Sequence, residues 1–259
     1  MNILSQKNLI NYTFLFIFFI GLHFSRDYGI SWDENYHRNN GKQNLAYALR
    51  FLSLDSILQV PKHVKNPQIG IGGYGPIFDI LCILSEKLLF VKDSKNIFLL
   101  RHKINFTIYF LSVFMFYLFL RKVFDNQLFG FLGAMFYFLS PRLFANGFYN
   151  PKDSVSQAVL ACSLLPLYLA YKNKSQKMSL IAGVLLGIAV SIRLPILYLP
   201  CLFILLLNYK SFKKGWLFKV EDQFKTVKIL FAVSTITSVF VFFPVLWEAP
   251  LNNLKIIFN

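Results

Sequence analysis

Long apolar stretches recur from one end of the chain to the other, and they limit its possible folds more than any other feature. Crossing the hydrocarbon core of a bilayer takes about 20 residues of helix, and the stretches are close to that length. The chain is 56% hydrophobic and only 15% charged over 259 residues, so a soluble domain of this size would lack the polar surface to cover its core. The sequence therefore predicts an all-α, polytopic membrane protein with about seven transmembrane helices, at residues 8–24, 104–120, 128–145, 154–171, 178–192, 194–208 and 228–247.

The positive charge of the chain indicates how these helices are oriented. The net charge is +15, and loops rich in Lys and Arg usually face the cytoplasm. If the apolar segment 76–91 does not cross the membrane and the N-terminus is cytoplasmic, the basic loops at 121–127, 171–177 and 209–225 all face the cytoplasm. This rule accounts for the charge, so we expect the lipid bilayer as a partner and no nucleic acid.

This topology leaves a long loop, about residues 25–100, on the outer face. Within it, apolar residues at helical spacing predict an amphipathic surface helix, namely Leu45, Ala48, Leu49 and Leu52. The segment 76–91 predicts a second surface helix, because polar residues interrupt it at Asp79, Ser85, Glu86 and Lys87. A segment rich in Gly and Pro, residues 66–76, joins the two.

Three polar clusters fall on the outer side of the predicted topology. They are WDENYH at 32–37, SPRLFANGFYNPKDS at 140–154, and Arg193 at the end of a span. Ionisable residues beside membrane spans are costly and indicate a functional site. A carboxylate at the lipid–water boundary can act as a general base, and neighbouring cations can hold a lipid-linked phosphate. The candidate residues are the carboxylates Asp33, Glu34 and Asp153, the cations Arg142, Lys152 and Arg193, and His37 as a proton relay.

Each candidate also has a purely structural interpretation. Asp153 is placed to cap a helix, and Arg142 and Lys152 are placed to extend toward lipid headgroups. Arg193 suits an interfacial anchor beside Pro195, and the pair at 33–34 suits the solvated start of a loop. His23, His63 and His102 are scattered without metal-ligand spacing, so no metal site is expected.

The order of these motifs resembles the GT-C membrane glycosyltransferases over nearly the whole chain. The resemblance includes an opening span, the Asp-Glu pair at 33–34, a loop helix introduced by Gly75-Pro76, a span beginning near Arg101, and the motifs NPKD (150–153) and SIRLP (191–195). More narrowly, the chain is similar to bacterial proteins related to the dolichyl-phosphate-mannose-protein mannosyltransferases and the aminoarabinose transferases.

The resemblance implies a single GT-C-like transmembrane domain over residues 1–259 in a bacterial inner membrane. It implies transfer of a sugar from a polyprenyl-phosphate donor to a protein, lipid or glycan acceptor on the periplasmic face, without a cofactor. Asp33 would be the catalytic carboxylate with Glu34 as its partner, Asp153 would shape a substrate site, and Arg101 and Arg193 would contact the lipid phosphate. Such enzymes lack the metal-binding Asp-x-Asp of soluble transferases, which is also absent from this sequence.

Two other functions stay open on the sequence. Family members usually continue with more spans, so a chain that stops at LWEAPLNNLKIIFN is compatible with a fragment or with a non-catalytic accessory protein. A lipid-sugar flippase or transporter is the other alternative. It would normally carry ionisable or broken segments at mid-membrane in two matching halves, whereas the charges here gather at one face.

Overall fold

The computed structural model describes residues 3–54, 74–213 and 222–258. Within these ranges the regular elements are helices, and one isolated β-bridge pairs Tyr74 with Arg193. This confirms the predicted all-α fold for the described residues. The helices are α1 (Ile3–Phe24), α2 (Glu34–Phe51), α3 (Ile77–Leu88), α4 (Ser94–Phe124), α5 (Gln127–Leu139), α6 (Pro141–Tyr149), α7 (Pro151–Asn173), α8 (Gln176–Ile192), α9 (Tyr198–Lys213), α10 (Asp222–Phe242) and α11 (Pro250–Phe258), with 3-10 turns η2 (Leu194–Leu197) and η3 (Pro244–Leu246).

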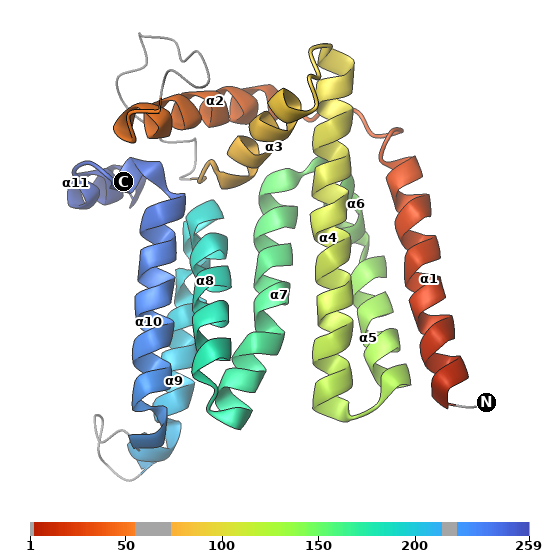
Figure 1. Ribbon diagram of the computed structural model, residues 1–259, viewed down its shortest axis with the longest axis vertical. Coiled ribbons are helices and arrows are strands. Elements are labelled where there is room, and N and C mark those ends of the chain that lie inside the picture. The colour runs from red at the N-terminus through yellow and green to blue at the C-terminus, as the bar shows by residue number, and fades with distance from the viewer. Residues whose placement is uncertain (1–2, 55–73, 214–221, 259) are drawn as a thin grey trace.

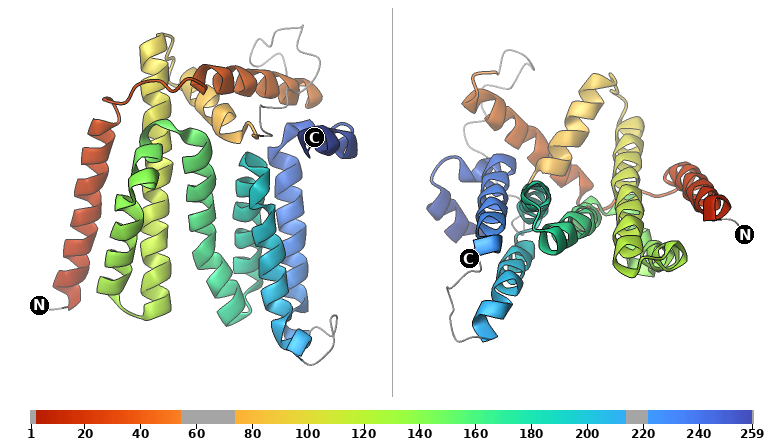
Figure 2. Two further views of the ribbon diagram at one scale, coloured as in Figure 1. Left: turned by 180° about the vertical axis from the view of Figure 1, so that it is seen from behind. Right: turned by 60° about the horizontal axis from the view of Figure 1, so that its bottom comes forward.

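The helices form an upright bundle and a layer across one end of it (Figure 1). In the bundle, α1, α4, α5, α7, α8, α9 and α10 stand side by side and run alternately up and down. The layer consists of α2, α3 and α11, and from behind α2 and α3 are seen above the upper ends of α7 and α8 (Figure 2). The basic loops at 121–127 and 171–177 lie at the opposite, lower end.

In the described part of the chain, three helices are long and apolar enough to cross a membrane: Ser94–Phe124, Pro151–Asn173 and Phe224–Phe242. The pair α5 and α6 makes a fourth candidate if it is one broken span. The apolar parts of α1, α8 and the segment η2–α9 are shorter, so the predicted number of seven spans is not confirmed. Large apolar side chains point outward from the bundle, among them Phe19 on α1 and Phe136 on α5, as expected of a membrane protein.

Proline residues correct two of the predicted spans. The span predicted at 128–145 is not one straight helix, because α5 ends at Leu139 and α6 begins at Pro141 with a bend of 64°. Proline has no N–H and its ring clashes with the preceding turn, so the helix cannot continue straight through it. The span predicted at 228–247 is also too long, since α10 ends at Phe242, just before Pro244.

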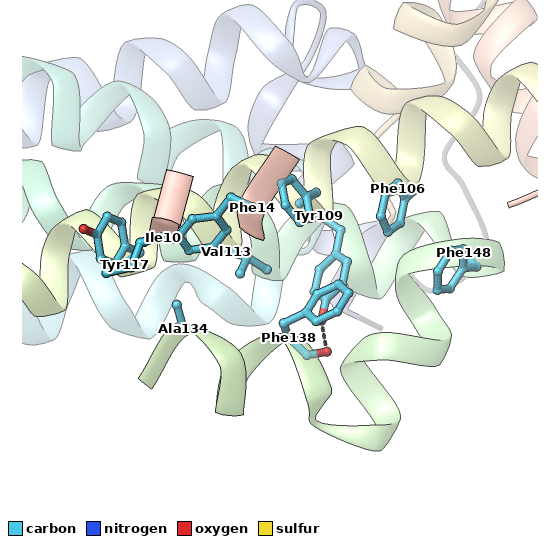
Figure 3. Close-up of a cluster of buried hydrophobic side chains, with 10 residues drawn as sticks. Ile10, Phe14, Phe106, Tyr109, Val113, Tyr117, Ala134, Phe138 and Phe148 are labelled. Carbon is cyan, nitrogen blue, oxygen red and sulfur yellow. Dashed lines mark hydrogen bonds between the residues drawn. The ribbon is translucent and has the colours of Figure 1, made fainter. Parts of the chain in front are cut away.

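Polar side chains of α4 form hydrogen bonds with the backbone of α5 and of α6. Tyr109 Oη donates a hydrogen bond to the carbonyl of Phe138 at 2.7 Å, drawn as a dashed line in Figure 3. Asn105 Nδ2 donates to the carbonyl of Asn146 at 3.0 Å near the end of α6, where that carbonyl also accepts from the Asn150 N–H. Carbonyl groups without a partner are costly at membrane depth, so the Tyr109 bond favours the bend between α5 and α6.

Aromatic side chains fill the core between α1, α4 and α5 (Figure 3). The Phe14 ring of α1 meets the Phe114 ring of α4 edge to face, with centroids 5.4 Å apart. Edge-to-face pairs add to the gain from burial, which gives one use for the many phenylalanines. The buried members of this cluster are Ile10, Phe14, Phe106, Tyr109, Phe110, Val113, Tyr117, Ala134, Phe138 and Phe148.

Small residues allow α8 and α10 to pack closely. Gly183 and Gly187 lie one turn apart on α8, and a Cβ at Gly183 would come within 2.6 Å of the Phe231 carbonyl on α10. Ser179 Oγ donates to the Val227 carbonyl at 2.6 Å in the same interface. Close contact through small residues is the usual way in which membrane helices associate.

The layer of surface helices agrees with its prediction in outline. The α3 helix has 12 residues, about 18 Å, which is too short to span a bilayer. The α2 helix includes three of the four predicted apolar positions, among which Leu45 is buried, whereas Leu52 lies just past its end and is exposed. It begins at Glu34, well before these apolar positions, so Asp33 stands at the start of a helix. Residues 66–73 of the predicted joint lie outside the described residues.

Candidate functional site

Asp33 is the last residue of the segment that leads from α1 into α2. Ser31 Oγ donates a hydrogen bond to Asp33 Oδ1 at 2.7 Å, and His37 Nε2 lies 3.2 Å from Asp33 Oδ2. Burial by itself raises the pKa of Asp33, but the Ser31 hydrogen bond and the His37 ring outweigh it and lower the pKa. Asp33 is therefore ionised at neutral pH, and its side chain is 34% exposed, so a substrate can reach it.

His37 is the buried partner of Asp33. Its ring packs edge-on against the ring of Tyr74, with centroids 5.7 Å apart. Burial and the positive charge of Lys152 lower the pKa of His37, against the opposing effect of Asp79 and Asp33. At neutral pH the uncharged ring thus donates its Nε2–H to Asp33, while Nδ1 has no hydrogen-bond partner in the described part of the chain.

Glu34 faces inward and ties α2 to α4. It is fully buried and accepts a hydrogen bond from the Ser31 backbone N–H at 3.0 Å. His102 Nε2 on α4 lies 3.1 Å from Glu34 Oε1. These contacts hold the turn around Asp33 in place and leave Glu34 without an exposed surface for a substrate.

A buried carboxylate on α3, Asp79, holds two cations from the bundle. Arg101 Nη2 on α4 donates to Asp79 Oδ1 at 2.5 Å, and Lys152 Nζ on α7 donates to Asp79 Oδ2. All three side chains are nearly inaccessible, with exposed fractions of 3% or less. The Arg101 guanidinium also lies over the ring of Phe78, 5.6 Å from its centroid. A lipid phosphate therefore has no direct access to Arg101 in this structure.

The segment 74–76, which we call the joint, connects this buried group to α8. Lys152 Nζ donates to the Gly75 carbonyl at 3.3 Å, and the Gly75 N–H donates to the Ile192 carbonyl at 3.1 Å. The backbone of Tyr74 forms the isolated bridge with Arg193. The joint thus lies between the first turn of α7 and the last turn of α8.

Arg193 and Asp153 form the second exposed part of the site. The Arg193 guanidinium pairs with Asp153 and lies over the Tyr74 ring, 5.6 Å from its centroid. The side chains of Arg193 and Asp153 are 39% and 25% exposed. His37 and Arg193 contact the same Tyr74 ring, so one aromatic side chain links the Asp33–His37 pair to the Arg193–Asp153 pair. We call these five residues the reaction face.

The structure brings most of the predicted site residues together and separates one. Arg142 is exposed near the start of α6 and makes no ion pair with any described residue. The interpretation of Lys152 as a headgroup contact is wrong, because Lys152 is buried against Asp79. The interpretation of Asp153 as the cap of its helix is also wrong, since Asn150 occupies the N-cap position of α7. Asp33, Asp153 and Arg193 are accessible members of the reaction face and His37 is a buried member of it. Glu34, Arg101 and Lys152 are buried and do not belong to it.

Asp79 is the main residue that the sequence analysis missed, since it counted only as a polar interruption. Asp79 and Glu86 lie on one side of α3, two turns apart, and both are buried. Glu86 pairs with Arg38 of α2, whose Nη2 donates to Glu86 Oε2 at 2.6 Å. Two carboxylates on one side of a mostly apolar helix were a signal that this side packs against cations.

The reaction face combines an accessible anion with an accessible cation. Asp33 can accept a proton, and the guanidinium of Arg193 carries several N–H donors, of which Asp153 takes only some. Such a pair can act on a hydroxyl group and a phosphate that approach together. Among the described residues, no group of three His, Cys, Asp or Glu side chains is arranged to hold a metal ion.

A scan against family models places the chain among known proteins. Residues 103–247 match the model of the dolichyl-phosphate-mannose-protein mannosyltransferases, which is more than half of the chain and includes Lys152, Asp153 and Arg193. The searches of curated proteins and of solved structures gave no match. The family match confirms the resemblance seen in the motifs. The chain therefore belongs to the dolichyl-phosphate-mannose-protein mannosyltransferase family.

Proposed function

We propose that the protein transfers a sugar, mannose in the first instance, from a polyprenyl-phosphate donor to a hydroxyl group of an acceptor. The family indicates a membrane glycosyltransferase. The observation that carries the proposal is the reaction face, where an ionised, half-exposed Asp33 and a half-exposed Arg193 are linked through His37 and Tyr74.

Asp33 acts as the general base in this proposal. The acceptor oxygen forms a bond to the anomeric carbon from the side opposite the phosphate, and its proton passes to Asp33 Oδ. The bond between the anomeric carbon and the phosphate oxygen breaks, and the electron pair leaves with the polyprenyl phosphate. Arg193 stabilises the negative charge that develops on that phosphate. His37 donates to Asp33 and orients its carboxylate.

The reaction takes place on the non-cytoplasmic side of the membrane in this proposal. The reaction face and the exposed basic loops lie at opposite ends of the bundle (Figure 1). The positive-inside rule assigns the basic end, which includes Lys122, Lys172 and Lys177, to the cytoplasm. The N-terminal end of α1 lies at that same end.

The test is a transfer assay with the full chain in nanodiscs, supplied with radiolabelled polyprenyl-phosphate mannose and an acceptor peptide or glycan. We expect Asp33→Asn to lower kcat by about 10²-fold or more, because general-base catalysis is worth roughly that much. The matched control is Asp27→Asn, which removes an exposed carboxylate from the same loop.

The outcome separates the alternatives. Loss of transfer with Asp33→Asn and normal transfer with Asp27→Asn support Asp33 as the base. Equal turnover by the wild-type and Asp33→Asn proteins removes Asp33 from the chemistry. If the donor lipid moves between the leaflets of a vesicle and no glycosylated product forms, the protein is a flippase and not a transferase.

A further inference from the structure

Asp79 lies behind the reaction face and is fully buried, and it precedes the part of the chain that matches the family model. Each of its carboxylate oxygens accepts from a different cation, Arg101 on α4 and Lys152 on α7. Asp79 itself belongs to α3, in the surface layer. One side chain thus joins the layer to two helices of the bundle.

This arrangement is not an efficient way to stabilise a fold. Removing three charged groups from water costs free energy, and their mutual attraction does little more than offset this cost. A buried ion group therefore adds little net stability. Arg101 also keeps Nε and Nη1 without a hydrogen-bond partner in the described part of the chain. What such a group does supply is a defined position, because moving any member leaves a buried charge unpaired.

The position that Asp79 defines is that of the joint. Lys152 Nζ, held by Asp79, also donates to the Gly75 carbonyl, and Gly75 in turn is bonded to Ile192 at the end of α8. The next residue back, Tyr74, pairs with the Arg193 backbone and contacts both the His37 ring and the Arg193 guanidinium.

We propose that Asp79 is a positioning residue for the sugar transfer: by holding Lys152 and Arg101 it locks the joint, so that Tyr74 orients His37 and Arg193 on the reaction face. The proposal rests on the proposed function for its link to catalysis, and on the contacts of the joint for its link to geometry. Asp79 itself touches no reacting group.

The chain offers a second way to move the joint, without removing a charge. A Cβ at Gly75 would collide with the Ser191 carbonyl, which is backbone and cannot swing aside. Gly75→Ala therefore pushes the joint away from α8 while Asp79, Arg101 and Lys152 keep their charges. If Asp79 acts through the joint, Asp79→Asn and Gly75→Ala have the same consequences.

The experiment compares these two variants with Glu86→Gln in the full chain, purified in nanodiscs. Glu86 is the matched control, because it is a buried carboxylate on the same side of α3 but pairs with Arg38, away from the joint. Two quantities are measured. The first is transfer of mannose from polyprenyl-phosphate mannose. The second is the rate at which diethyl pyrocarbonate modifies His37, which is 3% exposed, followed by mass spectrometry.

We expect Asp79→Asn and Gly75→Ala to lower kcat/KM by about tenfold or more, because small displacements of reacting groups have effects of that size. We also expect both to raise the modification rate of His37 by about fivefold, as the local structure opens. Glu86→Gln should leave His37 protected, and Asp79→Glu, which restores the charge, should recover part of the transfer rate.

Each outcome decides the proposal. Unchanged modification of His37 in folded Asp79→Asn and Gly75→Ala proteins overturns it. If Asp79→Asn does not yield folded protein, Lys152→Met, which removes the link between Asp79 and the Gly75 carbonyl, takes its place beside Gly75→Ala. If the wild-type chain transfers no sugar, the proposed function fails, while the modification rates still show whether Asp79 positions the joint.

Discussion

Two interfaces of this protein hold helices together in opposite ways. The α3 helix is bound to α4 and α7 by buried charges around Asp79, whereas α8 is bound to α10 by small residues such as Gly183 and Ser179. In the first, desolvation and attraction nearly cancel, so the ions set the position of α3 more than its stability. In the second, close contact of the backbones supplies stability directly.

This difference predicts what each interface tolerates. The contact between α8 and α10 should be sensitive to added volume and insensitive to pH. The contacts of α3 and the reaction face should respond to changes in charge and protonation. Transfer activity should depend most on the polar interface, since that interface carries the joint.

The largest effect is expected for Gly183→Leu. The added side chain would collide with Ser234 and with the Phe231 carbonyl on α10, and overpacking of this kind costs about 3 kcal/mol of unfolding free energy or more. Yield of folded protein and thermal unfolding in detergent measure the loss. Val184→Leu is the control, because Val184 is 38% exposed on the same helix, and an equal loss there would contradict the close packing of α8 on α10.

A smaller loss is expected for Lys152→Met. Asp79 keeps Arg101 as its counter-ion, so the change should lower the free energy of unfolding by about 2 kcal/mol, less than Asp79→Asn, which leaves two buried cations unpaired. Thermal unfolding of the two variants side by side tests the order. A greater loss with Lys152→Met would show that Arg101 does not compensate for it.

Tyr109→Phe probes a single hydrogen bond at the break between α5 and α6. It removes the bond to the Phe138 carbonyl while the ring stays, so we expect a loss of about 1 kcal/mol in unfolding free energy. Tyr12→Phe serves as its control, since Tyr12 is 67% exposed on α1. No difference between the two variants in thermal unfolding would mean that the carbonyl finds another donor.

The smallest effect is expected for the pH dependence of stability, to which His37 contributes. Its pKa in the folded protein lies below the ordinary 6.5, so the unfolded chain binds this proton more readily. Stability therefore falls as pH drops through about 6.5 and levels off below the folded pKa. Asp33 does not oppose this change, because its own pKa is lowered from 3.8 and it stays ionised throughout this range.

Thermal unfolding from about pH 7.5 to about pH 5 tests this effect, with His37→Gln as the comparison. The variant should lose the part of the pH dependence that His37 contributes. Identical curves for the two proteins would assign the pH dependence to other groups.

The sequence predicted the parts of the fold that depend on local composition. The apolar segments became helices, and the charge pattern correctly excluded 76–91 as a span, since α3 is a short helix. Helices are also interrupted at Pro141 and Pro244, which a search for long apolar stretches does not detect. The motifs around Asp33, Asp153 and Arg193 also led to the correct family.

The pairing of charged residues was not predictable in the same way. Asp79 and Lys152 are 73 positions apart in the chain, and Asp79 and Arg101 are separated by 22. Nothing in the local sequence says which carboxylate meets which cation. From the sequence, Lys152 was expected to bind substrate or to contact a headgroup, and Arg101 to contact the lipid phosphate, whereas both are buried against Asp79.

The sequence by itself determined that this chain is helical, suited to a membrane and a member of its family, because apolar length, proline and motif order are local properties of a chain. Only the tertiary structure decided which charges are accessible and which are buried between the helices. The reason is that the burial of a side chain depends on how α3 packs against α4, α7 and α8. This packing buries Asp79 and leaves Asp33 and Arg193 accessible.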